Sequence, residues 1–162
     1  MTQRIEGEIQ NGGYRIQIVA SKFNKGITER LVKGAVEALK KNNVKEDNIK
    51  IVYVPGAFEI PVVIKKICRK NHDKNDTDGI IALGCVIKGE TAHFEYVSSP
   101  VSHNLNHLSH QYEVPIGFGV LTCYDTEQAF DRSGIDPPTT ENNKGYEAAM
   151  VVLEMIDLLK KI

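Results

Sequence analysis

Four short apolar segments recur along the chain, and each is rich in Val or Ile. They are RIQIVA at residues 15–20, IKIVYV at 49–54, GIIALGCVI at 79–87 and VPIGFGVLT at 114–122. Nearly continuous apolar runs are typical of strands covered on both faces, and the last two segments follow this pattern. The first two alternate more between apolar and polar residues, so we expect each of them to be less completely buried.

Segments with helical periodicity follow these strands. Pro61 lies near the start of the second helical segment, where a helix tolerates proline best. Pro100 lies well inside the third, where we expect it to break or bend the helix. Gly134 is expected to stop the fourth. The helical segments expected are 27–42, 57–71, about 91–112, 126–134 and 143–162.

Strand and helix alternate throughout the chain. Such alternation favours right-handed crossover connections and a parallel sheet with helices on both faces. We therefore predict one domain over residues 1–162, with a three-layer α/β/α flavodoxin-like fold and a mostly parallel four-stranded sheet. A chain of 162 residues is long enough to bury a single core.

Composition narrows the class of protein. The net charge of −1 argues against a nucleic-acid or membrane-surface partner bound by bulk electrostatics. No apolar run approaches the roughly 18 residues that span a bilayer, and the N-terminal residues lack the apolar core of a signal peptide. We expect a soluble cytoplasmic protein whose widely spaced cysteines are reduced core thiols, namely Cys68, Cys85 and Cys123.

The segments after the strands are the candidate site, because ligands of such folds bind beyond the carboxyl ends of the strands. Residues 88–93 read KGETAH, and a strand that turns through glycine into a helix start exposes backbone N–H groups toward an anion. Thr91 can add a hydroxyl donor, and Arg132 can supply the forked cation that phosphate prefers. His93 can move protons at neutral pH. The pattern predicts a phosphate site beside a general acid/base.

Each candidate residue also has a structural interpretation. His93 alone could be a surface or capping residue, and Glu59 could complement a helix dipole. Phe23 and Phe58 could belong to the core, and Arg132 could be a solvated cation near a helix end. Their shared position after predicted strands favours the functional interpretation.

Other chemistry is less well supported. His103, His107 and His110 are spaced to share one helical face, which could bind zinc. The segment lacks the HExxH glutamate and a nearby carboxylate or cysteine, so we prefer a polar or subunit-facing surface and expect no metal. The sequence has no GxxxxGK[ST], GxGxxG or GxSxG motif, so neither a nucleotide-binding loop nor a serine nucleophile is expected.

Six motifs taken together resemble lumazine synthase, the family that performs the penultimate step of riboflavin biosynthesis. They occur in order from about residue 14 to the C-terminus, and the combination of VPGAFE with GETAHFEYV is highly specific. The motifs are SKFN (21–24), VPGAFEIP (54–61), LGCVIKGETAHFEYV (83–97), PIGFGVLT (115–122), EQAFDRSG (127–134) and NKG (143–145).

The resemblance implies a reaction between two small-molecule substrates. The compound 5-amino-6-(D-ribitylamino)uracil condenses with 3,4-dihydroxy-2-butanone 4-phosphate to 6,7-dimethyl-8-ribityllumazine, and phosphate and water are released. The resemblance implies neither a metal nor an organic cofactor, and it suggests a functional link to riboflavin synthase. Several protons move while one dianion is held, which agrees with the phosphate site and histidine inferred from the residues.

Roles on the phosphate side carry over to matching positions. His93 matches the proton-transfer histidine of the family. Glu90, through its backbone, and Thr91 match the helix-start pair that holds the butanone phosphate. Arg132 matches the phosphate-binding arginine, and Lys144 matches a basic residue near the same pocket.

Roles on the pyrimidine side also carry over. Phe23 matches the aromatic residue that stacks on the pyrimidine ring, and Asn24 follows it as an additional candidate. Phe118 matches a residue lent by a neighbouring subunit. The ribityl chain and the pyrimidine edge are implied to contact two short segments, Ala57, Phe58 and Glu59 in the first and Cys85, Val86 and Ile87 in the second.

The linker between the last two helices departs from the family pattern. Many members have GTKAGNKG, whereas residues 134–145 read GIDPPTTENNKG, which is four residues longer. The family forms pentamers, and some members assemble twelve pentamers into a shell. We expect the longer linker to favour a free pentamer over the 60-subunit shell, with residues 1–13 as an arm at a subunit interface. A non-catalytic flavin- or lumazine-binding oligomer is the alternative, although a carrier would not need His93.

Overall fold

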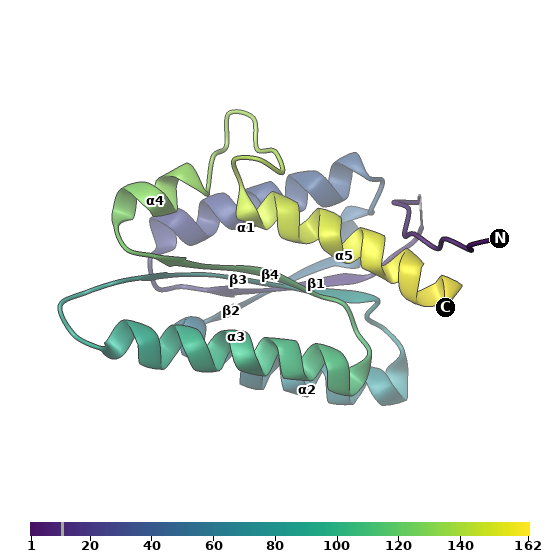
Figure 1. The fold of residues 1–162 in the computed structure, drawn as a ribbon, viewed down its shortest axis with the longest axis horizontal. Coiled ribbons are helices and arrows are strands. Elements are labelled where there is room, and N and C mark those ends of the chain that lie inside the picture. Colours follow the sequence, from purple (N-terminus) through teal and green to yellow (C-terminus); the bar gives the residue numbers. More distant parts are fainter. Residues whose placement is uncertain (11) are drawn as a thin grey trace.

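A parallel four-stranded sheet forms the middle layer of the computed structural model, which describes residues 1–10 and 12–162 (Figure 1). The strand order is β2-β1-β3-β4, and every neighbouring pair runs parallel. The predicted three-layer flavodoxin-like fold is therefore confirmed. The strands are β1 (Ile16–Ser21), β2 (Ile49–Val54), β3 (Gly79–Ile87) and β4 (Ile116–Cys123).

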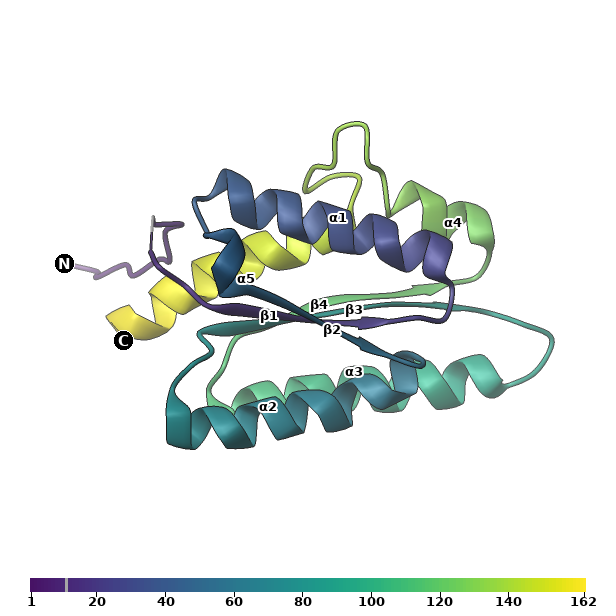
Figure 2. The ribbon, with the colours of Figure 1, turned by 180° about the vertical axis from the view of Figure 1, so that it is seen from behind.

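Helices cover both faces of this sheet (Figures 1 and 2). One layer contains α1 (Lys25–Lys41), α4 (Thr126–Asp131) and α5 (Lys144–Lys161), and the other contains α2 (Ile60–Lys74) and α3 (His93–Tyr112). Two short 3-10 helices, η1 (Glu46–Asn48) and η2 (Ala57–Glu59), precede β2 and α2. Each strand is followed by a helix, as the alternation of the sequence predicts.

The core has two parts, one on each face of the sheet. Alternate residues of a strand point to opposite faces, so Ile16 and Ile18 of β1 pack toward α1 and α5 while Val19 packs toward α2 and α3. The interior strands β1 and β3 are the most completely buried. The expected partial exposure of β1 is wrong, because β1 pairs with β2 on one side and β3 on the other.

The two edge strands are more exposed. Strand β2 leaves Ile51 and Tyr53 exposed, which confirms the expectation for this segment. Strand β4 leaves Phe118 and Thr122 exposed, so the expected cover on both faces is confirmed for β3 only. Edge position, which depends on pairing between distant segments, decides these differences.

Helix α3 runs without a break from His93 to Tyr112 and contains Pro100. Of the two expected effects of Pro100, a break or a bend, the break is therefore wrong. Proline removes one backbone hydrogen bond, but Val101 and Leu105 in the next turn are buried against the sheet and α2, which holds the helix together. Helix α4 ends at Asp131, three residues before the glycine expected to stop it.

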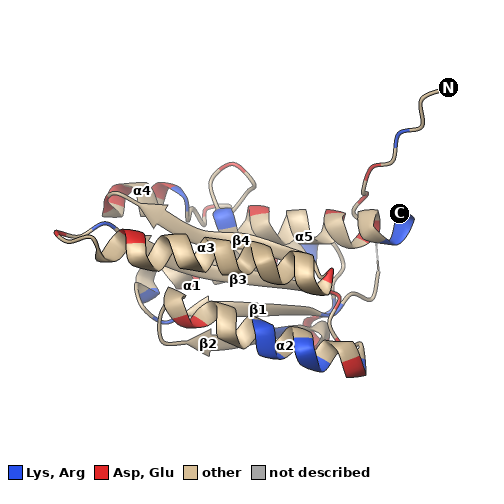
Figure 3. Ribbon diagram, turned by 60° about the horizontal axis from the view of Figure 1, so that its bottom comes forward, with Lys and Arg blue, Asp and Glu red and all other residues tan. Residues whose placement is uncertain are grey.

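Basic residues gather on α2, and the cysteines lie in the core. Figure 3 shows Lys and Arg on the later turns of α2, whereas Glu95 is the one charged side chain of α3 apart from its histidines. The three cysteines are free and buried, as predicted. Within the part of the chain that the structure describes, no helix is both long and apolar enough to cross a membrane.

Candidate active site

A cavity of about 710 Å³ lies beyond the carboxyl ends of β1, β2 and β3, beside the start of α3. This volume is in the range of small-molecule sites. The segments that follow β1, β2 and β3 surround it, and the last of these includes the start of α3. They are three of the four post-strand segments that the sequence pattern indicated, and the segment after β4 is not among the residues that line the cavity. The predicted residues that line it are Phe23, Ala57, Phe58, Glu59, Cys85, Val86, Ile87, Thr91 and His93.

The turn after β1 carries Phe23, which is 70% exposed. Lys22 N donates to Val54 O at 2.8 Å and Phe23 N to Pro55 O at 3.0 Å, which extends the β1–β2 pairing into the loops. Asn24 has a left-handed backbone with φ of 55°, a conformation that Asn tolerates. Its Nδ2 donates to Cys85 O at 2.9 Å, so Asn24 fixes this turn against β3.

The loop after β2 enters α2 through η2. Glu59 Oε2 accepts a hydrogen bond from Gly56 N at 2.9 Å, which satisfies a donor at the start of the helical segment. Glu59 therefore has a structural role as a capping residue, in addition to the helix-dipole role considered from the sequence. The same carboxylate also borders the cavity, so one residue can both hold the loop and face a ligand.

The segment after β3 carries the candidate phosphate and proton-transfer residues. Thr91 Oγ1 accepts a long hydrogen bond from His93 N at 3.3 Å, so Thr91 helps to begin α3. His93 is the first residue of that helix, as predicted, and it is exposed. Glu90 is also exposed but does not line the cavity. The helix start thus faces the cavity through Thr91 and His93.

Three other predicted residues lie outside the cavity of this single chain. Phe118 is in the middle of the edge strand β4 and is 50% exposed. Arg132 follows α4, and one of its guanidinium nitrogens donates to Gln128 O at 3.1 Å. Lys144 begins α5 and forms an ion pair with Glu147. The predicted site is therefore divided between a cavity and residues near β4, α4 and α5.

The sequence matches the family model described as 6,7-dimethyl-8-ribityllumazine synthase over residues 13–160. The chain belongs to this family. The match covers nearly the whole chain, including the cavity and the residues that lie outside it. Membership implies lumazine synthase activity, a transferase-type reaction of riboflavin biosynthesis, together with substrate binding and oligomeric assembly.

Cys85 lines the cavity, and its thiol is buried. The residue is 2% exposed, and desolvation raises the pKa of its thiol to about 12, with a smaller contribution from Cys123. The thiol is therefore neutral at physiological pH and is a poor nucleophile. This agrees with a non-covalent role for the residue.

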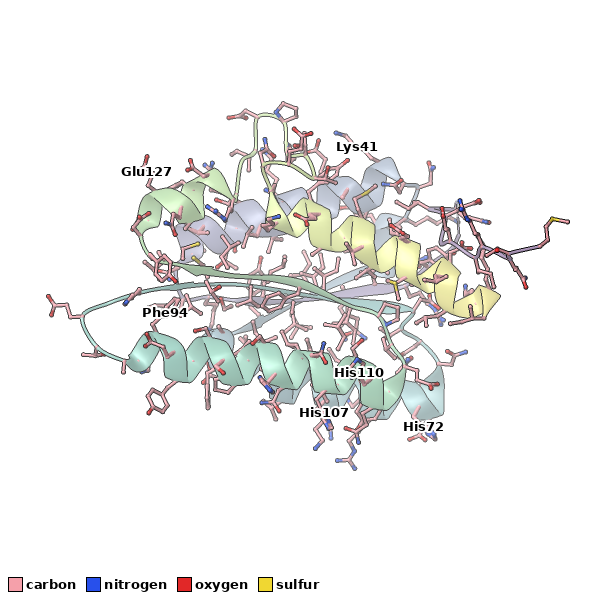
Figure 4. The ribbon with its side chains drawn as sticks, viewed as in Figure 1. Lys41, His72, Phe94, His107, His110 and Glu127 are labelled. Carbon is pink, nitrogen blue, oxygen red and sulfur yellow. The ribbon has the colours of Figure 1, made fainter. Side chains whose placement is uncertain are left out.

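Sequence reasoning missed several cavity residues of this lumazine synthase family member. Gly56, Phe94, Tyr96 and Val97 also line the cavity, as does Gly89 of the expected turn after β3. Figure 4 shows Phe94 at the start of α3. The motif GETAHFEYV contains Phe94, Tyr96 and Val97. Tyr96 and Val97 lie three and four residues after His93, a spacing that places them on the same side of a helix, whereas Phe94 directly follows His93 and lacks this spacing.

The histidines at the other end of α3 are separate from this site. Figure 4 shows His107 and His110 toward the end of the helix that is far from Phe94. No group of three or more metal-binding side chains is found among the described residues. A larger cavity of about 780 Å³ lies near His110, between the ends of α3 and α5, and contains none of the predicted site residues.

Proposed function

We propose that the chain condenses 5-amino-6-(D-ribitylamino)uracil with 3,4-dihydroxy-2-butanone 4-phosphate to give 6,7-dimethyl-8-ribityllumazine, phosphate and water. The observation that carries this proposal is that Phe23 and His93 line one cavity in a member of the lumazine synthase family. The exposed ring offers a flat surface for a heterocycle, and the imidazole can transfer protons near neutral pH.

The pyrimidine substrate would lie between the segments after β1, β2 and β3. Its ring would stack on Phe23, a contact worth about 0.5–1.5 kcal/mol beyond area burial. The ribityl hydroxyls would donate to Glu59 and lie along Ala57 and Phe58. Backbone groups of residues 85–87 would contact the pyrimidine edge, and the bond from Asn24 to Cys85 O supports a rigid wall there.

The phosphate-bearing substrate would lie at the start of α3. Backbone N–H groups near Glu90 and the hydroxyl of Thr91 would hold its phosphate, because a helix N-terminus favours anions. Arg132 and Lys144 would supply the positive charge that retains the dianion. Since these two side chains and Phe118 lie outside the cavity of one chain, we propose that subunit contacts complete the site.

His93 would act as the general acid/base. The amine of one substrate attacks the ketone of the other, and the resulting carbinolamine loses water to form an imine. Phosphate is eliminated to leave an enol that tautomerises to a ketone, and the ribitylamino nitrogen attacks this ketone to close the ring with loss of a second water. His93 would accept and return protons in these steps, and a positioned group of this kind typically contributes about 10²–10⁴ in rate. Holding both substrates in one cavity supplies much of the remaining acceleration.

A homo-oligomer fits the exposed surface of the α2–α3 layer. Phe58, Val62 and Tyr96 are each at least 60% exposed, and the outer face of α3 carries few charges (Figure 3). Contiguous exposed apolar surface marks interaction sites. We propose a pentamer in which neighbouring subunits share each active site.

The direct test mixes the purified protein with both substrates and follows the absorbance and fluorescence of the lumazine product. A reaction without protein is the essential control, because the condensation also occurs uncatalysed. Acceleration over this control supports the proposed reaction. Binding of the pyrimidine without acceleration by a folded oligomer would contradict it.

A further inference from the structure

The first and last residues of the linker between α4 and α5 lie side by side. Ser133 and Asn143 form an isolated antiparallel bridge, Gly134 N donates to Asn142 O at 2.8 Å, and Lys144 N donates to Arg132 O at 2.9 Å. The backbones of the two basic residues proposed to hold phosphate are therefore hydrogen-bonded to each other. We call residues 132–134 and 142–144 the linker base.

The side chain of Asn143 connects this linker base to two helices. Its Oδ1 accepts from Gly145 N at 2.9 Å and Tyr146 N at 3.0 Å, which caps α5. Its Nδ2 donates to Gly134 O at 2.8 Å and to Arg30 O at 3.1 Å. Asn143 is 1% exposed, so water has little access to its amide and a lost partner leaves a buried polar atom unsatisfied, which is costly.

Helix α1 packs directly against this amide. A Cβ atom at Gly34 would lie 2.2 Å from Asn143 Oδ1, so a larger residue at Gly34 would displace the side chain. One turn earlier on α1, Arg30 Nε donates to Ser133 O at 2.8 Å. The guanidinium of Arg30 also lies 5.2 Å from the centre of the Phe130 ring in α4, a distance suited to a cation–π contact.

We propose that Asn143 and Arg30 are positioning residues for the phosphate-bearing substrate, since they hold the linker base that carries Arg132 and Lys144. This inference rests on the proposed function for the identity of that substrate. Arg132 is exposed, and its guanidinium donates to Gln128 O of the preceding helix α4. The position of the Arg132 backbone therefore decides where the guanidinium charge lies. A displacement of about 1 Å at a substrate-positioning residue can cost roughly 100-fold in rate.

The side chain of Asn142, a residue of the linker base itself, provides a matched control. Asn142 Oδ1 accepts from Thr139 N at 2.8 Å, and its Nδ2 donates to Pro137 O at 3.0 Å. These side-chain bonds organise the outer loop and do not reach α1 or α5. Asn142→Ser therefore removes an amide of the same kind, one position away, without cutting the side-chain connection to Arg30.

The test compares the wild-type oligomer with Asn143→Ser, which keeps an oxygen that can cap α5 but loses both Nδ2 bonds. We expect a roughly tenfold higher KM for the phosphate-bearing substrate and roughly tenfold weaker binding of inorganic phosphate by calorimetry, as expected for about 1.4 kcal/mol of lost positioning. The KM of the pyrimidine substrate should change by less than about twofold, as should all constants of Asn142→Ser.

Arg30→Met is the second variant, because it leaves the α5 cap intact if Asn143→Ser does not fold. Like Asn143→Ser, it should raise the KM for the phosphate-bearing substrate and weaken the binding of inorganic phosphate. Equal effects on both substrates, equal effects of Asn142→Ser, or unchanged phosphate binding in the folded variants would overturn the inference. If the wild type does not accelerate the condensation, the proposed function fails, and phosphate binding to these proteins alone then decides whether the two residues position the anion.

Discussion

His93 is the residue on which the proposed chemistry most depends. We expect His93→Ala to lower kcat by about 10²-fold, while activity above the uncatalysed reaction remains because two substrates are still held together. Steady-state kinetics with both substrates measures this loss. His72→Ala, which changes an exposed histidine of α2, is the control and should behave as wild type. Wild-type turnover in His93→Ala would remove the imidazole from the mechanism.

The buried thiols predict how stability changes in alkaline solution. Desolvation raises the pKa of Cys85 to about 12 and that of Cys68 to about 11, from an ordinary value of 9.0. Above pH 9 the unfolded chain loses these protons before the folded chain does. The stability due to the neutral thiols is therefore fully present below pH 9 and is lost as the pH rises toward 11–12.

Thermal melts at pH 7, 9 and 10.5 measure this effect. We expect Tm to fall over the upper interval, and to fall less in Cys85→Ala because one of the three buried thiols is then absent. At pH 8 a thiol reagent should modify the folded protein slowly and the unfolded protein at once. Fast modification of the folded protein would contradict the burial of these side chains.

At the scale of elements, Asp157 of α5 fastens the N-terminal arm. Its Oδ2 accepts from Lys161 Nζ at 2.7 Å and from Glu8 N at 2.7 Å. The bond from Lys161, followed by the bond from Glu8, lowers the pKa of Asp157 below the ordinary 3.8. Its contribution to stability is therefore present above pH 3.8 and is lost as the pH falls through the lower pKa of the folded state.

Asp157→Asn should lower Tm at pH 7 and should allow faster proteolysis of the arm, because the amide cannot reproduce both charge-assisted bonds. The difference in Tm from wild type should shrink when melts are repeated at pH 3. Glu154→Gln changes another carboxylate of the same helix and serves as the control. A constant difference at both pH values would show that the charge of Asp157 is not the cause.

At the scale of the whole molecule, the long linker projects from the layer formed by α1, α4 and α5 (Figures 1 and 2). Its base is closed by the bridge between Ser133 and Asn143, so the added length extends outward. A projecting loop is an obstacle to packing pentamers into a shell. We therefore predict a free pentamer.

Light scattering separates the two assemblies clearly. Five chains of 18.0 kDa give about 90 kDa, whereas sixty chains give about 1080 kDa. We expect the smaller mass, and we expect a variant with the four added linker residues removed to keep the fold because the linker base remains. A mass near 1080 kDa for the wild type would contradict the role assigned to the linker.

Much of the fold and part of the site could be predicted from the sequence alone. Local apolar patterns and turn residues identified all four strands, the long helices and the carboxyl edge at which Phe23, Thr91 and His93 meet. These features depend on neighbours along the chain, since side-chain periodicity and helix starts are local properties. Glu59, which bonds Gly56 N and also borders the cavity, had both a structural and a functional interpretation from the sequence.

Only the tertiary structure decided which strands are interior and which predicted residues share a cavity. The burial of β1 follows from its pairing with both β2 and β3, and the continuity of α3 at Pro100 follows from packing of the next turn. The neighbouring backbones of Arg132 and Lys144 depend on the bridge between Ser133 and Asn143, to which Arg30 of α1 is hydrogen-bonded. Such contacts join residues far apart in the chain, and their energies depend on burial that no local pattern contains.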